Sequence, residues 1–236
     1  MALFDEAIQS VHEYHCAFGY PIGQSISDEI RTIRSNLVVK EAKTLKEALT
    51  INNHLEIVKG LVNCVYAAIG TIIAIQGLDL SFIDETAENI ACVGLIGSMG
   101  NTVRQDLTLI ADDLLTYAEM ILNQQETAER IAEFGVLCVY RIEMMCDAMQ
   151  IAIIPALKEV HRSNMTKLWV EDTEQRLEHI ALDSKRYADI AFRMRNDGGD
   201  GMVGYRLSDG KTLKSPMYSK ADLSPYFNEF LIEYLK

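Results

Sequence analysis

Acidic side chains in the second half of the chain have the types and the spacing that could hold a divalent cation. Asp112 and Asp113 are adjacent, Glu133 follows at the start of the next apolar run, and Glu143 and Asp147 lie four residues apart, on one face of a helix. Carboxylate oxygens that converge from two neighbouring helices are the hard ligands such an ion prefers. The alternative is that these charges form only the solvated faces of the two helices.

Aromatic side chains near the N-terminus could face a nucleotide base. Four such residues are close in sequence: His12, Tyr14, His15 and Phe18. Stacking on an aromatic ring tolerates any base and stabilises binding by about 1–3 kcal/mol per base. Packing into the core explains Tyr14 and Phe18 equally well. The serines and cysteines have no histidine partner at an interpretable spacing, so the sequence predicts no covalent catalysis.

The chain repeats itself. The triplet CVY at residues 64–66 returns at 138–140, and the same displacement of 74 residues carries Ile57 onto Ile131. Nearer the start of each copy the displacement is 73, which brings Arg31 onto Arg104. The sequence therefore predicts a tandem duplication of one helical unit, which folds as an intramolecular pseudo-dimer.

Long α-helices must position these side chains, and an all-α fold is predicted. No proline lies between Pro21 and Pro155, and apolar residues recur at three- and four-residue spacing. Ser27 and Pro155 suit helix starts. The predicted helices cover residues 3–17, 27–52, 55–76, 82–93, 103–123, 127–153, 155–164 and 173–194.

The predicted domain organisation follows the duplication. Residues 1–99 form the first helical repeat and residues 100–195 the second, joined at the glycines of 94–100. Residues 196–236 form a tail that packs on the same core. It comprises a mobile loop at 196–201, a short irregular or β-hairpin segment at 205–213 and a short helix at 225–235.

Composition and charge exclude several classes of protein. The net charge of −12 and the pI near 4.9 disfavour binding to a nucleic-acid polymer, which needs clustered Lys and Arg. The most apolar stretch, residues 61–80, contains Asn63, Gln76 and Asp79, so we expect no membrane span. The five cysteines are scattered and indicate reduced thiols in a cytoplasmic protein. An acidic protein that handles phosphates should use a metal or a local basic patch.

Four segments, in order, resemble a known family. They are VHEYHCAFGYPI at 11–22, the helix at 37–49, the helix at 60–70, and EVHRSNMTKL at 159–168 with DGK at 209–211 and KSPMY at 214–218. Together they resemble the MazG-like and phosphoribosyl-ATP pyrophosphohydrolase-like all-α nucleotide pyrophosphohydrolases. The last segments resemble a C-terminal signature found in many members, including phage-encoded ones.

The resemblance implies a site and a reaction. Such enzymes hydrolyse nucleoside triphosphates to monophosphate and pyrophosphate with Mg²⁺, or Mn²⁺, held by carboxylates on two helices. It implies metal ligands at Asp112, Asp113, Glu133, Glu143, Asp147 and Glu41, with Asp113 and Glu133 as the catalytic residues. The residues expected to contact substrate are His15, Asn164, Lys167, Trp169, Lys211, Lys214 and Tyr218. A solvated Lys-rich turn is the alternative for the tail lysines.

The first copy departs from the family pattern. Lys40 and Thr44 stand on its first helix, and Lys59 and Asn63 on its second, where acids are expected. Lysines at this seam should repel Mg²⁺ and could instead bind a phosphate directly. They could also be surface residues of a copy kept for packing.

The leading prediction is therefore a Mg²⁺-dependent nucleotide pyrophosphohydrolase acting on a (deoxy)nucleoside triphosphate. The alternative is an inactive relative that binds a nucleotide or a protein partner. We expect a homodimer, in the cytoplasm, or in the host cytoplasm if the protein is phage-encoded, with no nucleic-acid polymer or membrane as partner.

Overall fold

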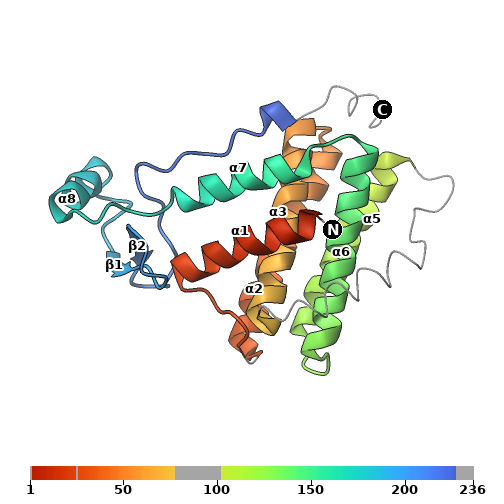
Figure 1. The fold of residues 1–236 in the computed structure, drawn as a ribbon, viewed down its shortest axis with the longest axis horizontal. Helices are drawn as coiled ribbons and strands as arrows, with labels where there is room; N and C mark the ends of the chain where they lie inside the picture. The colour runs from red at the N-terminus through yellow and green to blue at the C-terminus, as the bar shows by residue number, and fades with distance from the viewer. Residues whose placement is uncertain (1, 25, 78–101, 227–236) are drawn as a thin grey trace.

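The computed structural model describes residues 2–24, 26–77 and 102–226 (Figure 1). Within these residues the regular secondary structure is helical except for one small antiparallel sheet, so the predicted all-α fold with a short hairpin is confirmed. The elements are α1 (Ala2–Phe18), α2 (Asp28–Thr50), α3 (His54–Gln76), α5 (Val103–Leu122), α6 (Ala128–Ala148), α7 (Ile153–Met165), α8 (Thr173–Leu182), β1 (Ile190–Met194), β2 (Met202–Arg206) and the 3-10 turn η1 (Ser224–Tyr226).

Side-chain caps fix where the bundle helices begin. The Ser27 hydroxyl accepts a hydrogen bond from the Ile30 N–H, which confirms the predicted start of α2. Asn53 and Thr127 cap α3 and α6 in the same way, and Thr102 forms a reciprocal capping box at the start of α5. The predicted helix 82–93, the glycine segment 94–100 and most of the predicted helix 225–235 lie outside the described residues.

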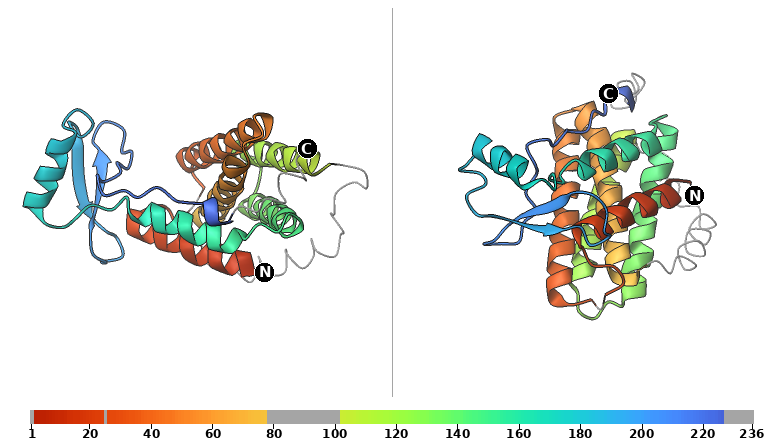
Figure 2. Two further views of the ribbon diagram at one scale, coloured as in Figure 1. Left: turned by 90° about the horizontal axis from the view of Figure 1, so that it is seen from above. Right: turned by 60° about the vertical axis from the view of Figure 1, so that its left-hand side comes forward.

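Four helices form the centre of the molecule, with α2 packed on α3 and α5, and α3 packed on α6. Helix α3 is apolar nearly all round, and Leu61, Val65 and Ile69 are fully buried. By length and composition it could cross a membrane, but most of it is buried inside the bundle, as in the core helix of a soluble protein. Figure 2 shows α1 and α7 together on one side of these helices.

Two arginines make reciprocal contacts between the two helical pairs. From the start of α2, Arg31 donates to the carbonyls of Ile121 and Asn123, at the end of α5. From the start of α5, Arg104 donates to the carbonyl of Leu49, at the end of α2. Helices α2 and α5 are therefore antiparallel. Such reciprocity is what two related units would give across a pseudo-twofold axis. The domain boundaries stay predictions.

The region after α7 differs from the prediction. The expected helix 173–194 ends at Leu182, because Ile190 and Phe192 join strand β1 and pack beside Trp169. Strand β1 pairs with β2, Phe192 opposite Gly204. The predicted hairpin at 205–213 is present only as a tight turn, closed by a bridge between Tyr205 and Thr212.

The loop between the two strands contains several hydrogen bonds of its own, and the mobility expected at 196–201 stays a prediction. Arg195 pairs with Asp197 and also donates to the carbonyl of Asp200. From β1, the Arg193 guanidinium donates to the carbonyl of Phe18, 2.6 Å away, at the end of α1. The hairpin is thus anchored to the helical part of the chain.

Candidate functional site

The two adjacent acids of α5 face different helices. Asp113 forms an ion pair with Arg141 of α6, and Asp112 pairs with Lys46 of α2 at 2.7 Å. Burial raises the pKa of Asp113, and the Arg141 guanidinium opposes that rise. Both carboxylates are therefore engaged with cations of the bundle, and they do not converge on a common point.

The remaining predicted acids of the second half follow the outer face of α6. Glu133 and Asp147 are exposed and Glu143 is half-buried, because the inner face of the helix is taken by apolar residues such as Val139 and Ile142. Within the described residues, no group of three or more His, Cys, Asp or Glu side chains is arranged to hold a metal ion. These residues, as placed, do not fit Mg²⁺ as a cluster.

Glu41 is the buried acid of the first copy, with 9% of its surface exposed at the contact of α2 with α3. Its carboxylate accepts a hydrogen bond of 3.1 Å from the Asn63 amide and pairs with the neighbouring Lys40. The seam of the first copy therefore holds the Glu41 carboxylate, the Asn63 amide and the exposed Lys40 ammonium group, while Lys59 pairs with Glu56 at 2.6 Å.

Lysines from three separate segments gather beside that seam. Lys167, just after α7, donates to Asn164 at 2.6 Å and lies 5.2 Å from the centre of the Tyr14 ring. Burial, followed by the charges of Lys214 and Lys40, lowers the pKa of Lys167 to about 8, and Glu41 opposes this. We call Lys40, Lys167 and Lys214 the lysine cluster.

The third lysine of the cluster is delivered by the segment after the hairpin. The Lys214 ammonium lies 3.8 Å from the centre of the Tyr218 ring, and Ser163 of α7 donates to the Tyr218 hydroxyl. The Ser215 N–H donates to the carbonyl of Lys167 at 3.3 Å, and the Ser219 N–H donates to Thr166. These bonds fix Lys214 and Tyr218 against the end of α7.

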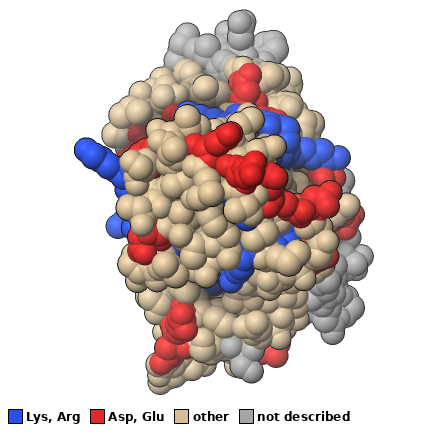
Figure 3. Space-filling model, turned by 90° about the vertical axis from the view of Figure 1, so that its left-hand side faces the viewer, with Lys and Arg blue, Asp and Glu red and all other residues tan. Residues whose placement is uncertain are grey.

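The lysine cluster is poorly compensated in charge. Among the described residues no ion pair joins Lys167 or Lys214 to a carboxylate, and Glu41 is already paired with Lys40. Figure 3 shows that acidic and basic side chains are interspersed on the face seen there, so the net charge of −12 does not make that surface uniformly acidic. A local basic patch of this kind attracts phosphate groups.

Other residues predicted to contact substrate lie elsewhere. Trp169 is 1% exposed and donates to the carbonyl of Leu213, so it is a core residue with almost no surface to offer a substrate. Lys211 is exposed in the turn after β2, where its N–H donates to the Asp209 carboxylate. Neither side chain is placed in the lysine cluster.

His15 is part of a buried polar contact in the bundle. Its Nε2 lies 2.7 Å from the Arg34 guanidinium, and its Nδ1 lies 2.8 Å from the carbonyl of Pro21. Burial and then the charge of Arg34 lower the pKa of His15 to about 3. The imidazole is therefore neutral, with Nδ1–H donating and Nε2 accepting, and its surroundings are those of a structural histidine.

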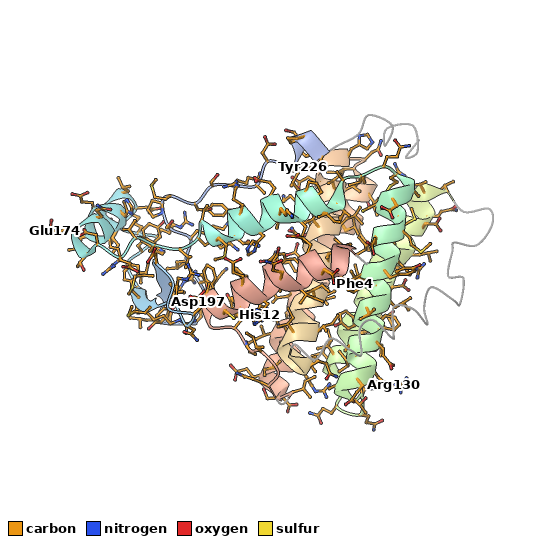
Figure 4. All side chains as sticks on the ribbon, in the orientation of Figure 1. Phe4, His12, Arg130, Glu174, Asp197 and Tyr226 are labelled. Atoms are coloured by element: carbon orange, nitrogen blue, oxygen red, sulfur yellow. The ribbon has the colours of Figure 1, made fainter. Side chains whose placement is uncertain are left out.

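A cysteine and a histidine meet on α1, contrary to the expectation that no such pair exists. The Cys16 thiol lies 3.4 Å from His12 Nε2, and Figure 4 labels His12 and Asp197 on the side where α1 meets the hairpin. Burial and then the charge of Asp197 raise the pKa of the Cys16 thiol. The thiolate is thus disfavoured, so the pair lacks the activated nucleophile that covalent catalysis needs.

No family model, no curated protein and no solved structure matches the chain. The function of this chain is therefore inferred from the geometry of the described residues and from the resemblance of its sequence segments.

Proposed function

We propose that this protein is a nucleotide-binding module that holds phosphate groups at the lysine cluster without a metal cluster. The observation that carries the proposal is the half-buried Lys167 ammonium, which donates to Asn164 at 2.6 Å and has no ion-pair partner among the described residues, while the charges of Lys214, Lys40 and Glu41 act on its pKa. A phosphate group would supply the missing negative charge and accept hydrogen bonds from the ammonium groups. The segment resemblance supports a nucleotide as the bearer of that phosphate.

Hydrolysis is the competing proposal. It needs several carboxylates around one ion, whereas Asp112 and Asp113 are paired with lysine and arginine on different helices. The same resemblance that favours a nucleotide keeps this reaction as the alternative. A cytoplasmic location belongs to the proposal, supported by the free thiols of Cys64, Cys138 and Cys146. Homodimer formation remains a prediction.

The binding proposal is tested by titrating ATP into the protein at low ionic strength with EDTA present. We expect Lys167→Met to weaken binding about tenfold, because one charge-assisted contact to phosphate is lost. Lys211→Met removes the same charge from an exposed turn outside the cluster and is expected to change the affinity less than about twofold.

Two results would overturn the proposal. One is no binding of ATP or of any other nucleotide by the wild-type protein, and the other is an equal loss of affinity in the two variants. A parallel assay with Mg²⁺ or Mn²⁺ and a panel of NTPs and dNTPs measures pyrophosphate release. Release that Asp113→Asn abolishes in a folded protein would establish the hydrolase in place of a simple binding module.

The proposal also predicts how ATP affinity depends on pH. A bound phosphate favours the charged form of Lys167, so the pKa of this amine is higher in the complex than the value of about 8 in the free protein. Affinity is therefore greatest below about pH 8 and falls as the pH rises through that value. Calorimetry across this range should show the decline in wild type and in Lys211→Met. It should be absent from Lys167→Met, and a decline retained there would contradict the assignment.

A further inference from the structure

Two half-buried lysines of the described residues, Lys167 and Lys214, have no carboxylate partner. The other half-buried lysines there, Lys46 and Lys59, form ion pairs with carboxylates at 2.7 and 2.6 Å. The Lys167 ammonium instead donates to the amide oxygen of Asn164 at 2.6 Å and reaches the Tyr14 hydroxyl at 3.4 Å. Both of its directed contacts are therefore with uncharged side chains, which stabilise an ammonium less than a carboxylate does.

These surroundings favour the neutral form of the Lys167 amine. Burial, followed by the charges of Lys214 and Lys40, lowers its pKa to about 8, so about a quarter of the amines are neutral at pH 7.5. For a lysine of ordinary pKa the neutral fraction at that pH is about 0.1%. Burial also raises the pKa of Tyr14 well above its usual value, so its hydroxyl adds no negative charge. The lone pair of the neutral amine is what attacks an acyl carbon.

The backbone brings Lys214 to the same end of α7. The segment that follows β2 passes there (Figure 1), and Ser215 donates from its N–H to the carbonyl of Lys167 at 3.3 Å. The Ser215 hydroxyl donates to the carbonyl of Thr166 at 3.2 Å. Lys214 immediately precedes this residue, and its ammonium lies 3.8 Å from the centre of the Tyr218 ring. A nucleophilic amine and a cation that can hold a phosphate group thus come from two segments in contact.

We propose that Lys167 is a site of acylation by acyl phosphates, in which Lys214 holds the phosphate group and the neutral Lys167 amine attacks the acyl carbon. The new N–C bond forms as the C–O bond to phosphate breaks. The products are an amide on Lys167 and inorganic phosphate, which takes up the amine proton. The inference rests on the proposed function, since the acyl donor uses the same phosphate-binding cluster. Acylation removes one positive charge from that cluster and thereby regulates it.

The experiment incubates the protein with acetyl phosphate and follows acetylation of each lysine over time by mass spectrometry. We expect Lys167 to be acetylated at least about tenfold faster than Lys158 and Lys211, although both of these are more exposed. The rate at Lys167 should rise with pH and reach half of its maximum near pH 8. A rate at Lys167 no greater than at the two exposed lysines would overturn the proposal.

Asn164→Asp tests whether the uncharged partner makes Lys167 reactive. The two side chains have nearly the same size, but aspartate places a carboxylate where the amide oxygen now lies, 2.6 Å from the ammonium. The pKa of Lys167 should rise, so its acetylation at pH 7.5 is expected to slow about tenfold. Gln125→Glu adds the same charge in the exposed turn between α5 and α6 and should leave the rate unchanged. Equal rates in wild type and Asn164→Asp would contradict the assignment.

A second reagent isolates the part played by Lys214. N-hydroxysuccinimidyl acetate acetylates neutral amines but carries no phosphate group. The ratio of the two rates at Lys167, acetyl phosphate over the ester, is corrected for any change in the charge of the amine. In Lys214→Met this ratio is expected to fall about fivefold, because the cation that holds the phosphate is lost. An unchanged ratio would overturn the role of Lys214 and with it phosphate-directed acylation.

ATP separates this inference from the function it rests on. If ATP binds at the lysine cluster, saturating ATP should slow acetylation of Lys167 about tenfold, and the acetylated protein should bind ATP about tenfold more weakly. Selective acetylation of Lys167 without any binding of ATP or protection by it would leave the acylation site standing, and the binding proposal would fail. If ATP binds but Lys167 reacts no faster than Lys158, the acylation proposal fails and the binding proposal stands.

Discussion

Replacing Arg31 with alanine is expected to lower the free energy of unfolding by about 3 kcal/mol, because hydrogen bonds from a charged group to buried carbonyls are lost. Arg31 is 6% exposed and donates to the carbonyls of Ile121, Asn123 and Glu126, at 2.8, 2.9 and 3.2 Å. The substitution leaves these oxygens, at the turn between α5 and α6, without their donor. Urea unfolding followed by far-ultraviolet circular dichroism measures the loss.

The matched control is the reciprocal arginine. Arg104 donates to the carbonyl of Leu49 and to the side chain of Asn52 but is only partly buried, so Arg104→Ala is expected to cost about 1 kcal/mol. Arg31→Lys keeps the charge and can replace only part of the bonding, so its stability should lie between wild type and Arg31→Ala. An Arg31→Ala protein as stable as wild type would show that this turn does not depend on the arginine.

Replacing Gly204 with alanine is expected to destabilise the hairpin by about 3 kcal/mol, through overpacking. A Cβ atom at this position would lie 2.8 Å from Cδ1 of Trp169 and still closer to Nε1 of the same ring. Trp169 cannot move away easily, because it is buried between Tyr187 and Phe192 and its N–H is bonded to the carbonyl of Leu213. The contact requires the strand or the indole to shift.

Tryptophan fluorescence reports this change directly, because Trp169 is the sole tryptophan of the chain. We expect a red-shifted emission and a lower urea midpoint by fluorescence in Gly204→Ala. Gly210→Ala is the control: its φ of +67° strains an alanine by about 1 kcal/mol, yet nothing lies within 4 Å of the added Cβ. Wild-type emission in Gly204→Ala would contradict the packing described for Trp169.

The helices could be predicted from sequence because their signals are local. Ser27 before two acids marks the start of α2, and the apolar spacing from Ile57 to Ile72 marks the buried face of α3. The strand at Ile190–Met194 was missed, because it is only five residues long and its burial does not alternate, so it cannot be separated from the helical pattern before it. What turns them into a strand is pairing with Gly204 and packing on Trp169, which are contacts between distant residues.

The candidate site was predictable only in part. The segment resemblance selected Asn164, Lys167, Lys214 and Tyr218, and the structure brings these together. The hydrogen bond between Tyr66 and His161 had no signal in the sequence, because 95 residues separate the two side chains and each alone is an ordinary helical residue. The acids of the second half were selected by their spacing along each helix. That spacing does not indicate which neighbouring helix each side chain will contact.

Lys214 reaches its place through bonds that depend on the hairpin and on the end of α7. The Leu213 N–H donates to the carbonyl of Gly204, the Tyr187 hydroxyl donates to the carbonyl of Lys214, and the Ser215 N–H donates to Lys167. During synthesis on the ribosome the helical bundle therefore emerges well before the cation that finishes its basic patch. A truncated polypeptide that stops before this segment would retain the bundle helices yet lack one of the three ammonium groups. Premature termination would therefore leave a folded bundle that binds phosphate groups less well.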